Sequence, residues 1–196
     1  VSGLLNPALG GRPVMPPAPP HLFEKPVSYA PFPWKVEEDA NKYRRAVYTF
    51  RRRSTPFPFL GAFDAPNGDF ACARRLRSNT PLSALTGLNE TIFVEAAQAL
   101  ALRVLNEAPA DDAARIDYAF RCCTSRAPTA AERDAIRANL QAEYERLKRR
   151  ELKANEIAFS SLTKLEQLPP DATPNDVAAW TLTARVLLNL DETLTK

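Results

Sequence analysis

The sequence lacks a long apolar run, because no stretch approaches the roughly 18 apolar residues that a transmembrane helix requires. Residues 1–5 also lack the basic and apolar regions that begin a signal peptide. The chain does not begin with Met, and we interpret its start as a domain boundary within a larger protein. We therefore expect no transmembrane segment in these 196 residues.

Histidine and cysteine, the residues of many catalytic and metal sites, are scarce. The one histidine, His21, lies among prolines, and no G-x-S-x-G turn is present to supply a serine nucleophile. A dyad of Cys72 and His21 has only composition in its favour. We assign no catalytic residue, and we expect this segment not to be an enzyme.

The three cysteines also do not form the pattern of a metal or haem site. Cys122 and Cys123 are adjacent, and adjacent side chains on a helix point about 100° apart, so both can hardly face one ion. A C-x-x-C-H haem motif is absent. We expect no metal and no cofactor here, and three reduced thiols; a disulfide from Cys72 to Cys122 or Cys123 is the alternative.

Proline, by contrast, is abundant: the chain has 18 prolines, and they concentrate in its first third. In residues 1–42 they exclude a helix and predict an extended arm. The arm contains several aromatic residues, which favours packing of the arm on the domain formed by residues 43–196 over free movement. Docking of the prolines onto a partner is the alternative. The aromatic residues of the arm are Phe23, Tyr29, Phe32 and Trp34.

The signals after residue 80 are helical and predict a mainly α fold, an irregular helical domain with at most a short strand pair. Helix starts are expected near Thr80, Asn89, Asp111, Thr129 and Thr173, where capping residues or prolines precede apolar positions at helical spacing. Upstream, residues 57–63 predict a short helix, and residues 46–50 predict one short strand or an extended stretch. Inner faces are expected to include Phe93, Ala97, Leu100, Val104, Ile116, Phe120, Cys123, Ile136, Leu140, Tyr144, Leu147, Val177, Trp180, Ala184 and Leu187.

Positive charge is concentrated between residues 40 and 80, a segment that contains nine basic residues and two acidic ones. Eight of the nine are arginines, whose planar fork suits bidentate pairing with carboxylate, phosphate or sulfate. One interpretation is a face that binds anions. The candidate binding residues are Arg44, Arg45, Arg51, Arg52, Arg53, Arg74, Arg75 and Arg77.

The competing interpretation gives these arginines a structural role. They can pair with acids of the helical half, or they can bond backbone carbonyls in an irregular region that offers few ladder partners. No RNA-binding signature is present, so we expect no nucleic acid. The candidate acids are Glu90, Glu95, Asp111 and Asp117.

Asp64 lies at the start of a turn within the basic segment. The flanking Phe63 and Phe70 are expected to point inward and to draw the turn against the core. A carboxylate in that position is costly unless it is paired. We therefore predict that Asp64 is at least half buried and accepts hydrogen bonds from Arg74, Arg75 or turn amides.

Several short motifs follow one another in a characteristic order. They are Gly10-Gly11-Arg12-Pro13, Arg44-Arg45-Ala46-Val47-Tyr48, Phe63-Asp64-Ala65-Pro66, Cys72-Ala73-Arg74-Arg75, Thr80-Pro81-Leu82-Ser83-Ala84-Leu85, Leu88-Asn89, Phe120-Arg121, Arg126-Ala127-Pro128-Thr129-Ala130-Ala131-Glu132 and Leu187-Leu188-Asn189-Leu190-Asp191-Glu192. Together they resemble the domain of unknown function 1553 family, found in planctomycete-type cytochrome c multidomain proteins. The adjacent pair Cys122-Cys123 departs from the family pattern.

The resemblance implies a setting rather than an activity. It suggests the C-terminal part of an exported protein, periplasmic or extracellular, with haem c only in modules upstream of this chain. It implies a non-catalytic module whose partners are the upstream domains of the same polypeptide. The alternative is a module that binds an acidic glycan or another polyanion through residues 43–77.

Overall fold

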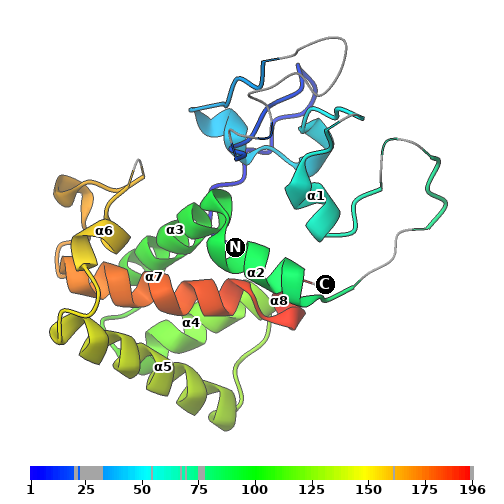
Figure 1. Cartoon of the computed structure of the whole chain (residues 1–196). Helices are drawn as coiled ribbons and strands as arrows, with labels where there is room; N and C mark the ends of the chain where they lie inside the picture. Colours follow the sequence, from blue (N-terminus) through cyan, green and yellow to red (C-terminus); the bar gives the residue numbers. More distant parts are fainter. Residues whose placement is uncertain are drawn as a thin grey trace. The chain divides into compact units, whose positions relative to one another are not determined.

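The computed structural model describes residues 1–19, 22, 33–53, 55–66, 68, 70–74, 78–160 and 162–194. The chain forms two compact units, residues 4–86 and residues 87–196 together with 1–3. The described residues contain eight α-helices, and their only β-type pairing consists of isolated bridges (Figure 1). The prediction of a mainly α fold is confirmed.

In the first unit, the proline-rich arm pairs with the segment that follows it. Val14 and Thr49 form an isolated parallel bridge, in which Val14 N donates to the Tyr48 carbonyl and Phe50 N donates to the Val14 carbonyl, both at 2.8 Å. A second parallel bridge joins Asn6 to Arg44. These bonds hold an extended backbone without building a sheet.

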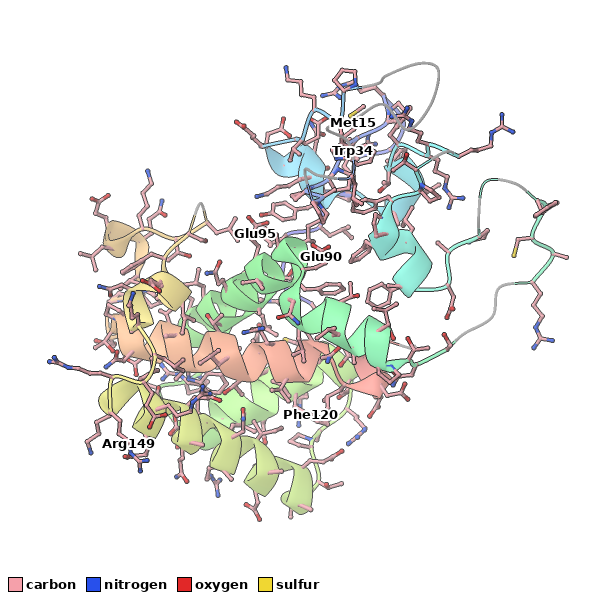
Figure 2. All side chains as sticks on the ribbon, in the orientation of Figure 1. Met15, Trp34, Glu90, Glu95, Phe120 and Arg149 are labelled. Carbon is pink, nitrogen blue, oxygen red and sulfur yellow. The ribbon has the colours of Figure 1, made fainter. Side chains whose placement is uncertain are left out.

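Aromatic rings form the centre of this unit. Trp34 stacks on Phe57 at 5.7 Å between ring centroids and meets Phe50 edge-on at 6.4 Å. Its indole Nε1 donates to the Pro16 carbonyl at 2.9 Å, close to Met15, which Figure 2 labels beside Trp34. Trp34 therefore packs against rings that follow the arm in the sequence, while the packing of the whole arm on residues 43–196 stays a prediction. The other arm aromatics, Phe23, Tyr29 and Phe32, lie outside the described residues.

Short helices connect these segments. The 3₁₀-helices η2 and η3 span Ala40–Tyr43 and Ala46–Tyr48, and α1 spans Pro58–Ala62 with proline in its first turn. The short strand expected at residues 46–50 is thus largely a 3₁₀ turn, and within it Thr49 makes the bridge to the arm.

The helix α2, Pro81–Asn89, links the two units. Thr80 Oγ1 accepts a hydrogen bond from Ser83 N at 3.1 Å, and Ser83 Oγ donates to the Thr80 carbonyl at 2.8 Å. The predicted cap at Thr80 is therefore formed, and the buried Ser83 has its polar groups bonded to Thr80.

Four longer helices build the second unit: α3 (Thr91–Glu107), α4 (Asp112–Thr124), α5 (Ala130–Lys148) and α7 (Pro174–Leu188). Each starts within two residues of a position that the capping signals predicted. Side chains that accept from first-turn amides precede all four, and α5 and α7 have complete capping boxes.

The helix α7 is the centre of this unit and packs against α3, α5 and α6, which spans Ala154–Ala158 (Figure 1). Its buried residues include the predicted Val177, Trp180, Ala184 and Leu187. It also buries side chains on its remaining faces, as expected for a helix enclosed by others. These are Ala178, Ala179, Thr181, Thr183 and Leu188.

In the second unit three short elements were not predicted: α6, the 3₁₀-helix η4 (Leu165–Gln167) and α8 (Asp191–Leu194). Elements of three to five residues are too short to show a helical period. No described helix is both long and apolar enough to cross a membrane.

Candidate functional site

The arginine-rich segment begins with Arg44, which the arm surrounds. Its guanidinium group donates to the carbonyl oxygens of Ala8 and Arg12 at 3.0 and 3.2 Å, and also to that of Gly10. It lies over the ring of Tyr48, 3.7 Å from the ring centroid. Arg44 thus satisfies backbone acceptors in a region without ladder partners.

The arm reaches Arg44 through a glycine turn. Gly10 and Gly11 have φ of +73° and +86°. This left-handed region is unfavourable for residues that have a Cβ atom, so it favours glycine. The Gly10 amide donates to the Tyr48 hydroxyl at 3.0 Å, and a Cβ on Gly11 would lie 3.6 Å from an Arg44 Nη atom. The motif of residues 10–13 therefore places carbonyls around the guanidinium.

Two more arginines of this unit have defined partners. Arg51 donates to the Pro66 carbonyl at 2.9 Å. Arg12 and Glu37 form a bidentate pair at 2.6 and 3.0 Å, and the Glu37 hydrogen bonds raise the pKa of Arg12. Sequence reasoning did not place Arg12 in the cluster, although it stands in the Gly10-Gly11-Arg12-Pro13 motif.

The remaining candidates divide into exposed, half-buried and undescribed residues. Arg45, Arg53 and Arg74 are exposed, and no described residue accepts a hydrogen bond from their guanidinium groups. Arg52 is half-buried. Arg75 and Arg77 lie outside the described residues. The anion-binding interpretation of the cluster as a whole stays a prediction.

Three of the acids considered as partners, Glu90, Asp111 and Asp117, are bonded within their own unit. Asp117 accepts from Arg133 at 2.7 and 3.0 Å, and these bonds lower the pKa of Asp117. Asp111 accepts from the Ala114 amide at 2.9 Å. Glu90, labelled in Figure 2, caps α3. Backbone carbonyls, rather than these acids, are therefore the observed partners of Arg44 and Arg51.

Asp64 accepts hydrogen bonds across its loop, at 2.7 Å from both the amide and the hydroxyl of Ser78. It is half-buried, with φ of +54°. The Phe63 ring packs at a tilt against Phe59, with 5.0 Å between the ring centroids. Phe70 is 79% exposed, so the expectation that Phe70 points inward was wrong. The bonds to Ser78 hold the ends of the loop together, and Phe70 need not anchor it. Pairing with Arg74 or Arg75 stays a prediction.

A second cluster of charges lies in the second unit, where three of the motifs meet. Arg126 donates to Glu132 at 2.6 Å and to Glu192 at 2.7 Å. Its guanidinium lies 4.8 Å from the ring centroid of Phe120, which is labelled in Figure 2. We name Arg126, Glu132 and Glu192 the Arg126 clamp.

The clamp shares Glu132 with the capping box of α5. Hydrogen bonds from Arg126, and then from the Thr129 amide and hydroxyl at 2.7 and 2.8 Å, lower the pKa of Glu132 to about 2. The clamp thus ties the start of α5 to α8. The sequence does not predict that these motifs touch, and the opposite charges of Arg126 and Glu192 are the signal that could have indicated it.

The motif at residues 187–192 also approaches α2. A Cβ on Gly87 would lie 2.6 Å from Asn189 Oδ1, so a larger residue at position 87 would force the Asn189 side chain to move. Arg185 of α7 donates to the carbonyl of Leu88, at the end of α2. These contacts fix the last turn of α2 to the second unit.

The three cysteines are free thiols. Cys72 is exposed, Cys122 is half-buried, and burial raises the pKa of Cys123 to about 12. A thiol with so high a pKa is a poor nucleophile. Among the described residues, no group of three His, Cys, Asp or Glu side chains could hold a metal ion.

Comparison with known proteins gives one match. The family model described as Protein of unknown function (DUF1553) matches residues 1–140, well over half of the chain. No curated protein and no solved structure matches the sequence.

Proposed function

Because the chain belongs to the family described as Protein of unknown function (DUF1553), we propose that it is a non-catalytic interaction module of an exported, cytochrome c-type multidomain protein. In this proposal it packs against the upstream domains of the same polypeptide. The setting is periplasmic or extracellular, as the resemblance of the motifs implies.

The observation that carries the proposal is a pair of exposed leucines on α2. Leu82 and Leu85 are 62% and 58% exposed. They lie three residues apart, so they share one face of the helix. Large apolar side chains grouped on a surface favour a protein interface over open solvent.

The first unit as a whole supports this role. Seven of the ten large apolar side chains that are exposed among the described residues belong to it: Leu5, Leu9, Val36, Val47, Phe70, Leu82 and Leu85. Arg44 and Arg51, by contrast, donate hydrogen bonds to backbone carbonyls of the same unit. The unit therefore exposes several large apolar side chains that a partner could cover.

The test is binding of this chain to the separately produced upstream domains, measured by calorimetry. Replacing both leucines, Leu82→Ser with Leu85→Ser, is expected to weaken the complex at least tenfold, since burying one leucine contributes about 1.5–3 kcal/mol. Leu165→Ser is the matched control, because Leu165 is 66% exposed but belongs to the second unit. An unchanged affinity in the double variant contradicts the proposal.

The alternative is binding of an acidic glycan or another polyanion. The exposed Arg45, Arg53 and Arg74, which lack described acceptors, favour it. Binding of a sulfated oligosaccharide should then weaken steeply with added salt and fall on Arg45→Gln with Arg53→Gln. Affinity that is insensitive to salt would reject this alternative, whereas the apolar interface should respond little to salt.

A further inference from the structure

A cavity of about 200 Å³ lies between α4, α5 and α7 in the second unit. Its apolar lining includes Phe120, Ile136, Leu187 and Leu190, and Glu132 of the Arg126 clamp also lines it. Three separate motifs of the sequence, those at residues 120–121, 126–132 and 187–192, therefore each contribute to one cavity. The module role proposed above uses none of them.

Two polar side chains in the cavity lining have unmet hydrogen bonds. Thr183 Oγ1 and Asn139 Oδ1 are buried, and neither has a hydrogen-bond partner. Thr183 is only 1% exposed. A buried polar atom without a partner costs roughly 1–3 kcal/mol, so a ligand that supplies the partner gains affinity.

We propose that this cavity binds a small molecule with one ring and a hydroxyl group, of the phenol class. An apolar cavity of about 150 Å³ suffices for benzene, so about 200 Å³ admits a single substituted ring. A hydroxyl group both donates and accepts, so it can donate to Asn139 Oδ1 or accept from Thr183 Oγ1. Both oxygens are covered by neighbouring atoms, so the ligand reaches them after a rotation of either side chain.

The experiment titrates the whole chain with phenol and with toluene, which has the same shape but no hydroxyl, and follows amide chemical shifts. Phenol is expected to perturb α5 and α7 and to bind several-fold tighter than toluene, the effect of about one hydrogen bond. Thr183→Val removes the hydroxyl at nearly constant volume and should bring the phenol-to-toluene affinity ratio close to one.

A pair of alanines on α5 provides the steric control. Ala135 lines the cavity and Ala138 does not, and both are exposed. Ala135→Phe should abolish binding of both probes, while Ala138→Phe should leave it unchanged.

The proposal is overturned if neither probe binds, or if Ala135→Phe leaves binding intact. Equal affinities of the unmodified chain for phenol and toluene would overturn the assignment of the hydroxyl class. Circular dichroism of each variant verifies that it is folded. Ala138→Phe shows whether a phenylalanine on α5 affects binding of the probes when it lies outside the cavity lining.

Discussion

Arg44 shows how one side chain can organise a segment that has little regular structure. Its guanidinium group bonds carbonyls at residues 8, 10 and 12 and lies on Tyr48. A lysine ammonium is a point charge, and it cannot reproduce a planar fork that both donates to several carbonyls and stacks on a ring. The first unit should therefore be sensitive to this one residue.

We predict that Arg44→Lys lowers the free energy of unfolding of the first unit by about 1–2 kcal/mol, because the carbonyls of residues 8, 10 and 12 lose the one charged donor that bonds all three. Trp34 belongs to this unit and Trp180 to the other, so Trp34 fluorescence in a Trp180→Phe background isolates the transition in urea. Arg45→Lys at the exposed neighbouring position should have little effect. Equal effects of the two substitutions would contradict the role given to Arg44.

Glu132 provides a second prediction at the residue scale. Its pKa is about 2 in the folded chain, below the usual value of about 4.3 for an unfolded glutamate. Between these values the unfolded state binds more protons, so the stabilisation is complete above about pH 5 and is lost as the pH falls toward 2.

The measurement is the free energy of unfolding of the second unit between pH 6 and 2. Glu132→Gln should remove part of the loss on acidification, whereas Glu145→Gln, at a 55% exposed side chain of the same helix, should not. A pH profile that Glu132→Gln leaves unchanged would rule out the Arg126 clamp as its cause.

At the scale of elements, α7 is the central helix of the second unit, because other helices cover several of its faces. Two neighbouring positions test this. Leu187 is 1% exposed, whereas Val186 is 45% exposed. The environment of each side chain, rather than the composition of the helix, sets the cost of truncating it.

We therefore predict that Leu187→Ala lowers the stability of the second unit by about 2–5 kcal/mol, through lost burial and the space left behind. Val186→Ala should cost less than about 1 kcal/mol. Chemical denaturation followed by Trp180 fluorescence in a Trp34→Phe background measures both. Similar losses at the two positions would mean that α7 is less enclosed than the structure indicates.

At the scale of the whole molecule, the two units differ in the size of their cores. Among the described residues, Val14, Pro16 and Phe57 are the buried apolar side chains of the first unit. The second unit buries a continuous cluster contributed by α3, α4, α5, α6 and α7. Since stability depends on buried apolar area, the first unit should be the weaker one.

We predict that the two units unfold in separate transitions, the first unit at the lower urea concentration. The variants Trp34→Phe and Trp180→Phe each leave one tryptophan and thus report one unit. Coincident midpoints for the two variants, with equal denaturant dependence, would show instead that the chain unfolds as one cooperative body.

The sequence by itself determined where the four longer helices of the second unit begin, because helix starts depend on local chemistry. Thr129 and Glu132 close a capping box within one turn, and Pro174 starts α7. Such interactions join residues three or four positions apart, so they can be recognised without knowing the fold.

Only the tertiary structure decided which charges and polar atoms meet. Arg126 is 66 residues from Glu192, Arg44 is 36 residues from Ala8, and Thr183 lines a cavity with Asn139. Arg44 bonds backbone carbonyls and not a distant carboxylate, because the fold brings residues 8–12 of the arm back to Arg44. Local patterns contain no information on that return, because packing of distant segments sets it.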